Sequence, residues 1–355
     1  MAMKILSVGT ALPPHYYDQE ALLAAFKQEW GRQHHNTRRV EQLHRAVMVG
    51  GRHLALPMEA YPALESFGDA NDAFIRVGTD IGADAIAQAL AEAGLVPTDV
   101  DAIFFTSVTG ISAPSIDARL VNRMGLRPDI KRLPIFGLGC VAGAAGTARL
   151  YDYLRAWPEH VAVLLSVELC SLTLQRQDLS IANLIASGLF GDGAAAVLAV
   201  GDAHPKAAEA RGPAVQATAS RFYPDTEGVM GWSIGDSGFK IVLSADVPRM
   251  VSDNLRADVD GFLAQHGVTL DEIESFVCHP GGPKVLMAFE QALDRPREAF
   301  QVTWDSLLQV GNLSSSSVLL VLRDTMDEHR PRPGSLGLML AMGPAFCSEL
   351  VLLRW

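Results

Sequence analysis

The sequence lacks several features, and each absence excludes a class of protein. Only four of its 355 residues are cysteines, with no C-x-x-C pair and no short zinc spacing, so neither a disulfide framework nor a metal site is expected. No apolar run reaches the roughly 18 residues of a membrane-spanning helix. The apolar N-terminal segment ends at Gly9 and Pro13, too early for a signal peptide. A cytoplasmic protein with free thiols and no stable membrane insertion is therefore predicted.

Positive charge and aromatic side chains are also scarce. The 29 Lys and Arg against 40 Asp and Glu give a net charge of −11, and aromatic residues make up 7% of the chain. This acidic balance argues against general nucleic-acid binding. Hydrophobic residues at 49% and charged residues at 19% are typical of a well-packed globular enzyme. The length indicates two domains or one large duplicated domain.

Strand-like and helix-like segments alternate along the chain. Apolar runs predict strands at residues 5–8, 102–107, 161–167, 194–200, 273–277 and 337–342. Helical periodicity falls at residues 82–93, 142–154, 247–266 and 315–328. The alternation predicts an α/β protein in which helices cover mixed sheets.

Weak internal symmetry suggests two halves, with a joint near residues 203–221 where prolines and glycines interrupt the pattern. A strand, a glycine-bearing turn and a helix of small residues occur at 135–150, and this order recurs at 307–321. Duplicated halves would place Cys140 and Asn312 face to face. Because α/β proteins often repeat such units, symmetry alone leaves duplication open.

Three polar residues in glycine-bearing turns form a candidate nucleophilic site: Cys140, His279 and Asn312. Cys140 lies between glycines at the start of an expected helix, where the helix dipole favours a thiolate. An imidazole can hold the thiol proton, and an amide can orient that ring or stabilise an oxyanion. The order Cys, His, Asn fits both peptide hydrolysis and thioester condensation.

The residues around the cysteine favour condensation. Papain-like proteases carry an aromatic residue close after the nucleophile and disulfides around it, whereas Val141, Ala142 and Gly143 follow here. The Gly-Gly turn after His279 leaves space for a narrow, elongated substrate arm. Acyl transfer by a condensing enzyme is the stronger interpretation.

Four motifs, in this order and spacing, resemble the type III polyketide synthases of the chalcone synthase superfamily. They are Gly-Cys-Val-Ala-Gly at 139–143, Leu-Phe-Gly-Asp-Gly-Ala-Ala-Ala at 189–196, His-Pro-Gly-Gly-Pro at 279–283 and Gly-Asn-Leu-Ser-Ser at 311–315. Segments 114–117 and 167–173 resemble the bacterial branch that makes alkylpyrones and alkylresorcinols from long acyl chains.

The resemblance implies a thiolase-like, five-layered αβαβα fold of two duplicated halves with mixed sheets. Residues 1–212 would carry the nucleophilic cysteine, and residues 213–355 the histidine and the asparagine. A homodimer is implied as well.

The resemblance also implies roles for individual residues. Cys140 would accept the starter from acyl-CoA, and His279 would keep it ionised. His279 and Asn312 would polarise malonyl-CoA and stabilise the enolate and the condensation oxyanion. Phe190 would be a gatekeeper between a CoA tunnel and a cavity. Coenzyme A arrives with the substrates, so no permanently bound cofactor is expected.

Further positions resemble the walls of the family's cavity. Ala113, Cys170 and Thr173 are small, which predicts room for a long aliphatic starter because each buried methylene contributes about 0.8 kcal/mol. Ser314 is expected to reach the cavity. A second gatekeeper is expected near residues 238–243, where Ile241 stands at the best-matching position.

Two other segments carry weaker resemblances. Gly343 and Pro344 begin a segment similar to the family's Gly-Pro-Gly cyclisation loop, with Ala345 in place of the second glycine. The Arg- and His-rich stretch 31–53 contains Arg45 and Arg52, which are candidates for binding CoA phosphates. A solvated helix face explains that stretch equally well.

The predicted function is a type III polyketide synthase. It would load a long-chain acyl-CoA, extend it by repeated decarboxylative condensation with malonyl-CoA, and form an alkylpyrone or alkylresorcinol.

One alternative is a single-round ketoacyl synthase of fatty-acid initiation, whose usual His-x-x-Asn and Asn-Thr-Ser-Ala contexts differ from those here. Another is a non-catalytic acyl-lipid binding protein on the same scaffold. A hydroxymethylglutaryl-CoA-type synthase would need a carboxylate beside the thiol, and no motif places a Glu near Cys140.

Overall fold

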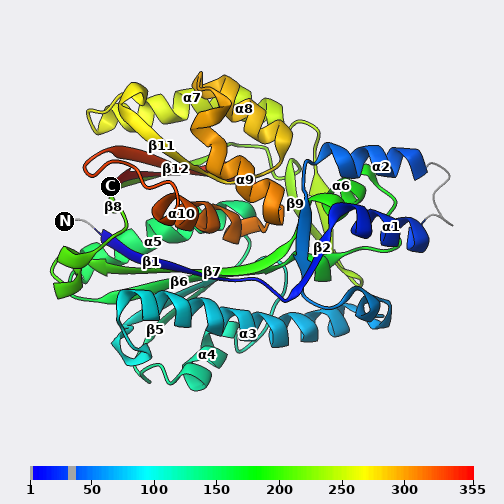
Figure 1. Ribbon diagram of the computed structural model, residues 1–355, viewed down its shortest axis with the longest axis horizontal. Coiled ribbons are helices and arrows are strands. Elements are labelled where there is room, and N and C mark those ends of the chain that lie inside the picture. The colour runs from blue at the N-terminus through cyan, green and yellow to red at the C-terminus, as the bar shows by residue number, and fades with distance from the viewer. Residues whose placement is uncertain (1–2, 31–36) are drawn as a thin grey trace.

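The computed structural model describes residues 3–30 and 37–355 (Figure 1). The strands are β1 (Met3–Ala11), β2 (His15–Asp18), β3 (Gly51–Leu54), β4 (Ala102–Thr106), β5 (Lys131–Ile135), β6 (Val161–Leu169), β7 (Asp192–Gly201), β8 (Ala214–Phe222), β9 (Met230–Gly235), β10 (Gly238–Leu243), β11 (Ile273–Cys278), β12 (Leu336–Gly343) and β13 (Cys347–Arg354). The helices are α1 (Gln19–Trp30), α2 (Thr37–Ala46), α3 (Phe67–Ala93), α4 (Ile116–Met124), α5 (Ala142–Ala156), α6 (Ile181–Leu189), α7 (Val247–Gln265), α8 (Pro283–Leu293), α9 (Gln301–Val310) and α10 (Ser317–Asp327).

Within these ranges the main sheet has nine strands in the order β11-β12-β13-β8-β1-β7-β6-β4-β5. It is mixed, since β4 pairs in parallel with β5 and β6 whereas β1 and β7 are antiparallel. Two residue pairs, Met3 with Val215 and Lys4 with Ala214, join the N-terminal strands to the C-terminal ones. The sheets expected for two halves are therefore hydrogen-bonded into one.

Five layers are visible in Figure 1. Helices α3 and α4 cover the outer face of the N-terminal strands, and α7, α8 and α9 cover the outer face of the C-terminal strands. Helices α5 and α10 lie between the two groups of strands and share one hydrophobic core with both. Strands with helices on both faces read as continuous apolar runs, and all of β7 is buried accordingly.

The two central helices approach each other very closely. A Cβ on Gly143 of α5 would lie only 2.3 Å from the carbonyl oxygen of Ser315, just before α10. A glycine is therefore required there for the two helix starts to meet. This contact brings the segment of Cys140 and the segment after Asn312 to the centre of the molecule.

All six predicted strands and all four predicted helices are present. Within the region predicted as a joint, 203–221, residues from Ala214 onward form β8, which pairs with β13 and β1. The sequence did not predict β8, because its alanines and serines give no strand-like apolar run and its partner strands lie far away in the sequence. The division at residues 212/213 remains a prediction.

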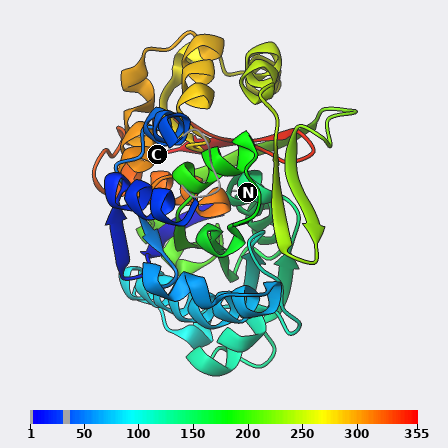
Figure 2. The ribbon, with the colours of Figure 1, turned by 90° about the vertical axis from the view of Figure 1, so that its right-hand side faces the viewer.

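Strands β9 and β10 form a hairpin outside the main sheet (Figure 2). Phe239 fixes this hairpin by packing edge-on against Phe67 at the start of α3, with ring centroids 5.4 Å apart. The hairpin thereby becomes a wall beside the centre of the molecule.

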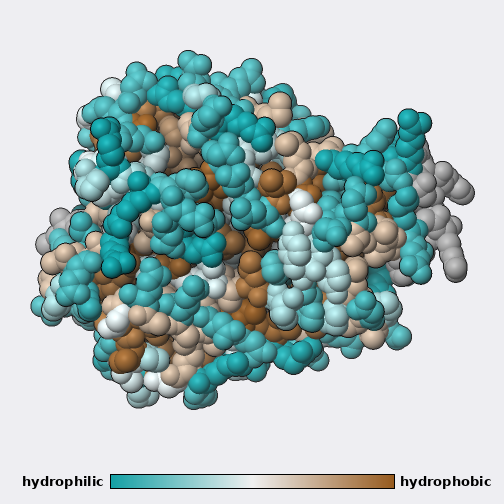
Figure 3. All heavy atoms as spheres, viewed as in Figure 1, coloured by the Kyte–Doolittle hydropathy of each residue, from teal (hydrophilic) through white to brown (hydrophobic). Residues whose placement is uncertain are grey.

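No helix in the described ranges is long and apolar enough to cross a membrane. Hydrophilic residues cover much of the face in Figure 3, and hydrophobic residues gather along its middle. All four cysteines are free thiols.

Candidate active site

Cys140 lies in the single turn of 3-10 helix, Gly139–Val141, that precedes α5. Gly139 has a φ of +57°, a left-handed conformation that glycine adopts without strain. The thiol is buried, and its Sγ donates a hydrogen bond of 3.7 Å to Ser314 Oγ. The predicted tight turn before a helix is confirmed.

His279 follows directly after β11. Its backbone N–H donates to the carbonyl oxygen of Leu340 on β12 (2.9 Å), which continues the strand pairing by one residue. The ring is buried, with 3% of the residue exposed. Neither ring nitrogen has a hydrogen-bond partner among the described residues, so the imidazole is free to serve a substrate.

Asn312 and Phe190 are held together by the backbone. The N–H of Asn312 donates to the carbonyl of Leu189 (2.9 Å), and the N–H of Gly191 donates to the carbonyl of Asn312 (3.0 Å). The Asn312 side-chain oxygen accepts from the Ser314 N–H (2.8 Å), which turns its NH₂ group toward the carbonyl of Gly281 (3.4 Å). The amide therefore presents a donor rather than an acceptor.

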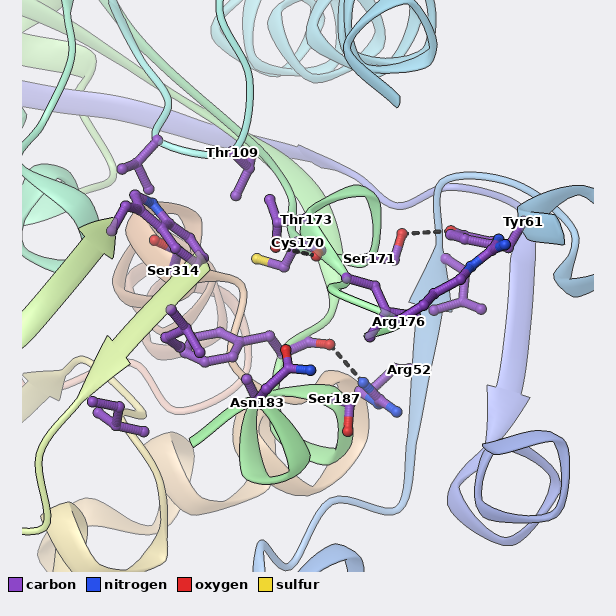
Figure 4. Close-up of a pocket in the computed structure, with 18 of the residues that line it drawn as sticks. Arg52, Tyr61, Thr109, Cys170, Ser171, Thr173, Arg176, Asn183, Ser187 and Ser314 are labelled. Atoms are coloured by element: carbon purple, nitrogen blue, oxygen red, sulfur yellow. Dashed lines mark hydrogen bonds between the residues drawn. The ribbon is translucent and has the colours of Figure 1, made fainter. Parts of the chain in front are cut away.

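Two cavities meet at Cys140 and Phe190, which line both. The His279 cavity, of about 500 Å³, also contains His279, Asn312, Gly281 and Gly282 in its wall. The Cys170 cavity, of about 230 Å³, contains Cys170, Thr173, Ile241 and Ser314 (Figure 4). The structure thus brings the predicted triad to one cavity wall and places four of the predicted cavity residues in the wall of the second cavity.

Burial controls the charges of the reactive pair. It raises the pKa of the Cys140 thiol to about 12, against a smaller lowering by the hydrogen bond with Ser314. It lowers the pKa of His279 to about 3. Burial alone therefore favours a neutral thiol and a neutral imidazole at neutral pH, and the imidazolium–thiolate pair expected from the sequence stays a prediction.

Glu168 is a buried carboxylate that the sequence reasoning missed. It is the penultimate residue of the buried strand β6 and accepts hydrogen bonds from Thr109 Oγ1 (2.9 Å), Val108 N (3.1 Å) and the Ser315 hydroxyl. Its charge contributes to the raised pKa of Cys140. The sequence could have identified Glu168, because it directly follows the strand predicted at 161–167 and lies within the segment 167–173 that resembles the family.

The segment corresponding to the predicted cyclisation loop contributes to the walls of both cavities. Pro344 lines the Cys170 cavity, while Phe346 lines the His279 cavity. A Cβ on Gly343 would lie 2.7 Å from the backbone N of Val141, so the loop lies directly against the cysteine turn. Ala345 has a φ of +105°, a conformation that favours the glycine it replaces.

Two predicted site residues, Ala113 and Arg52, lie elsewhere than expected, whereas the assignment of Arg45 to CoA phosphates stays a prediction. Ala113 is exposed on the loop before α4 and belongs to neither cavity wall. Arg52 is buried in the wall of the Cys170 cavity, because its stem packs over Gly191 and Gly311. Arg45 is exposed and pairs with Glu20 (3.2 Å). Residues 31–36 of the same basic stretch lie outside the described residues.

Other lining residues were not predicted. The hairpin supplies Met230 and Leu243 to both cavities and Trp232 to the Cys170 cavity. The exposed Lys284 lines the His279 cavity. Leu243 lies within the segment expected to hold the second gate, and Lys284 directly follows the His-Pro-Gly-Gly-Pro motif. Trp232 pairs with Ile241 across the hairpin. No group of His, Cys, Asp and Glu in the described chain is arranged to hold a metal ion.

Comparison with known families covers nearly the whole chain. The N-terminal domain of chalcone and stilbene synthases matches residues 2–204, and the C-terminal domain of these enzymes matches residues 214–355. The chain belongs to the chalcone and stilbene synthase family.

Individual relatives agree with this assignment. A 1,3,6,8-tetrahydroxynaphthalene synthase of Streptomyces peucetius subsp. caesius is 53% identical, over 99% of this chain and 93% of the relative. A putative chalcone synthase of Bacillus subtilis (strain 168) is 35% identical, over 99% of this chain and 98% of the relative. The crystal structure of 1,3,6,8-tetrahydroxynaphthalene synthase from Streptomyces coelicolor A3(2), a bacterial type III polyketide synthase, superimposes with a TM-score of 0.93 at 30% identity, covering 99% of both chains.

The protein is therefore a type III polyketide synthase with the thiolase fold. Enzymes of this kind are acyltransferases that catalyse decarboxylative condensation with malonyl-CoA. They use CoA thioesters as substrates and need no permanently bound cofactor. The alternatives of a single-round ketoacyl synthase and a non-catalytic binding protein are not retained. The long-chain starter stays a prediction, because these relatives include tetrahydroxynaphthalene synthases.

Proposed function

We propose that this polyketide synthase builds a polyhydroxylated aromatic product of the tetrahydroxynaphthalene type from malonyl-CoA units. The observation that carries the proposal is the junction at Cys140 and Phe190. One sulfur atom borders both a cavity with His279 and Asn312 and a second cavity without them. This arrangement suits a polyketide chain that is extended in the His279 cavity and held in the Cys170 cavity.

In the loading step, the neutral His279 accepts the proton of the Cys140 thiol as the sulfur attacks the thioester carbonyl. A tetrahedral oxyanion forms and collapses, which expels the coenzyme A thiolate and leaves an acyl group on Cys140. His279 protonates the departing thiolate. The raised pKa of Cys140 supports this coupled proton transfer over attack by a preformed thiolate.

In the extension step, malonyl-CoA loses carbon dioxide, and the electron pair of the broken bond becomes an enolate. The Asn312 NH₂ group and His279 line the cavity where the enolate oxygen would lie, and both can donate hydrogen bonds to it. The enolate carbon attacks the acyl carbon on Cys140, and the sulfur leaves as a thiolate. Transfer of the lengthened chain back to Cys140 allows another round.

Lys284 and Arg45 are the candidate partners for CoA phosphates. Lys284 is exposed in the wall of the His279 cavity. Arg45 is exposed on α2, whose residues Leu43 and Ala46 line the same cavity. Such cations attract phosphate at modest desolvation cost.

The product class is supported by the 53% identical relative, which is named for 1,3,6,8-tetrahydroxynaphthalene. Hydroxyl groups on alternate carbons of a naphthalene skeleton are what a folded chain of malonyl-derived two-carbon units provides. We expect the chain to adopt its folded conformation in the Cys170 cavity, where Trp232 and Ile241 of the hairpin form part of the wall.

A second candidate is the alkylpyrone or alkylresorcinol synthesis predicted from the sequence, with a long acyl-CoA starter. One observation favours it: the Cys170 cavity extends to apolar residues of α1 and its neighbours, namely Leu22, Ala25, Phe26 and Met58. Apolar walls of this kind suit an aliphatic chain.

A homodimer in the cytoplasm is part of the proposal. Strand β5 is the outermost strand of the sheet and is largely exposed, with Leu133 and Phe136 about half exposed. Such an edge suits pairing with a second copy. Four free thiols suit a reducing compartment. Light scattering coupled to gel filtration tests the dimer, and a monomeric mass at micromolar concentration would rule it out.

The test of the function supplies malonyl-CoA alone, and then malonyl-CoA with acyl-CoAs of graded length. We expect an aromatic product from malonyl-CoA alone, identified by mass, and none from Cys140→Ala. Alkylated products that form only with an added acyl-CoA would establish the second candidate instead. Absence of any polyketide from correctly folded protein would refute both.

A further inference from the structure

Arg52 is a buried cation in the wall of the Cys170 cavity (Figure 4). It lies on β3 and is 4% exposed. Burial lowers its pKa to about 10, so the guanidinium remains charged at neutral pH. A charge removed from water is costly unless partners compensate it.

The described residues accept hydrogen bonds from only part of the Arg52 guanidinium. Nη1 donates to the carbonyl oxygen of Phe190 (2.7 Å). Nε is buried and has no acceptor among the described residues. A guanidinium has five N–H donors in a planar fork, so Arg52, which lines the cavity, keeps donors that the protein does not use.

No carboxylate in the described chain forms an ion pair with Arg52 within 4.0 Å. Asp192 is the acid whose charge acts most strongly on it. The Asp192 oxygens are occupied by the N–H of Ala55 (2.6 Å), the N–H of Ser171 (2.8 Å) and the Ser171 hydroxyl. Asp192 therefore compensates the charge from a distance and leaves the donors of Arg52 open.

Most of the side chains near Arg52 in the cavity wall are apolar, so its charge indicates which kind of ligand the cavity binds. Leu22, Phe26, Leu54 and Met58 line the same cavity, and their side chains offer no charged or strong acceptor. An alkyl chain gains nothing from a guanidinium, whereas an anionic oxygen gains a strong, charge-assisted hydrogen bond in a cavity of low dielectric.

We propose that Arg52 binds the 1,3-dicarbonyl oxygens of the growing polyketide, in the enolate form, and thereby selects oxygen-rich chains over alkyl chains. The inference rests on the proposed function and names a specificity-determining residue for it. Two oxygens on alternate carbons of an enolate can accept two parallel N–H bonds from the planar fork, a match that a lysine ammonium lacks. The contact with Phe190 would couple chain recognition to the residue between the cavities.

The experiment compares Arg52→Met, which keeps much of the side-chain volume, with Arg52→Lys and with Arg149→Met. Arg149 is an exposed arginine on α5, paired with Asp152 at the surface. Each variant receives malonyl-CoA alone and malonyl-CoA with decanoyl-CoA, and kcat/KM is measured for each product. Loss of a bidentate charged contact corresponds to about tenfold or more.

We expect Arg52→Met to lower kcat/KM for the malonyl-only product about tenfold or more, and for the decanoyl-primed product less than about threefold. Arg52→Lys should recover part of the malonyl-only activity, and Arg149→Met should change neither product. Equal losses for both products would overturn the inference, because they would show a role through Phe190 alone. Decanoyl-primed products from the wild type without any malonyl-only product would instead refute the proposed function.

A binding measurement gives a second readout that does not depend on turnover. Pentane-2,4-dione is a small 1,3-dicarbonyl whose enol and enolate differ in ultraviolet absorption. Wild-type protein should bind it with an increase in the enolate band, and correctly folded Arg52→Met should lose that increase. An unchanged band in Arg52→Met would contradict the inference.

Discussion

The two cavities on either side of Phe190 share a nucleophile but differ in how their polar groups are used. In the His279 cavity, both ring nitrogens of His279 lack hydrogen-bond partners within the described part of the chain, and the Asn312 amide is turned by Ser314 to present a donor. In the Cys170 cavity, most polar side chains are already engaged with the protein, as Thr173 is with the carbonyl of Cys170 (2.7 Å).

This difference separates chemistry from selectivity. Hydrogen-bond donors that face a forming oxyanion lower the barrier of a reaction. Engaged polar groups and apolar walls instead define a shape, and Arg52 is the exception within that shape. Substitutions in the first cavity should therefore change rate, whereas substitutions in the second should change which product forms.

The largest expected effect removes the atom that both cavities share. Cys140→Ala should abolish condensation, by about 10⁴-fold or more, because no other group can hold the acyl chain. The rate of product formation measures it. Cys278→Ala is the matched control, since Cys278 is buried in the core beside His279 but faces neither cavity. Turnover surviving in Cys140→Ala would show that another residue carries the chain.

Removing the boundary between the cavities should have the next largest effect. Phe190→Ala should merge the two spaces, lower kcat/KM about tenfold through poorer positioning, and broaden the product mixture. Product masses and rates measure this, with Phe222→Ala as a control because Phe222 is 53% exposed on β8. An unchanged product mixture would mean that Phe190 does not separate the cavities.

The pH dependence of thiol alkylation sharpens the account of the His279 cavity. Because the pKa of Cys140 is raised to about 12, only the rare thiolate reacts with iodoacetamide at neutral pH. The inactivation rate should rise by about tenfold per pH unit between roughly pH 7 and 9, without a plateau. A rate independent of pH across the neutral range would indicate an imidazolium–thiolate pair instead.

The smallest expected effect is a change in stability, from a substitution in the loop that begins at Gly343 and borders both cavities. Ala345→Gly should stabilise the protein by about 0.5–1 kcal/mol, because Ala345 has a φ of +105° that glycine adopts freely. Chemical denaturation measures it. Ala341→Gly, in the middle of the buried strand β12, should destabilise by a similar amount. If both variants lost stability equally, the loop would not be strained at Ala345.

The sequence was sufficient to locate the reactive residues, because each lies in a short turn of recognisable composition. His279 comes shortly after the strand predicted at 273–277, and Cys140 and Asn312 come shortly before the helices predicted at 142–154 and 315–328. Strands such as β6 and β7 were found because burial on both faces makes them continuously apolar.

What the sequence could not show depends on contacts between distant segments. Arg45 and Arg52 look alike in one basic stretch, yet one is exposed and the other is buried over Gly191 and Gly311. The neighbourhood of Glu168 arises only when Ser315 folds against β6. The exposure of Ala113 likewise depends on how the loop before α4 runs over the surface.

The most direct test of the central claim is mass spectrometry of the peptide that contains Cys140, after brief reaction of the protein with malonyl-CoA and acid quenching. The account predicts a ladder of adducts on that cysteine, spaced by one malonyl-derived two-carbon unit. A single adduct of fixed mass, or a ladder on Cys170 or another cysteine, would contradict it.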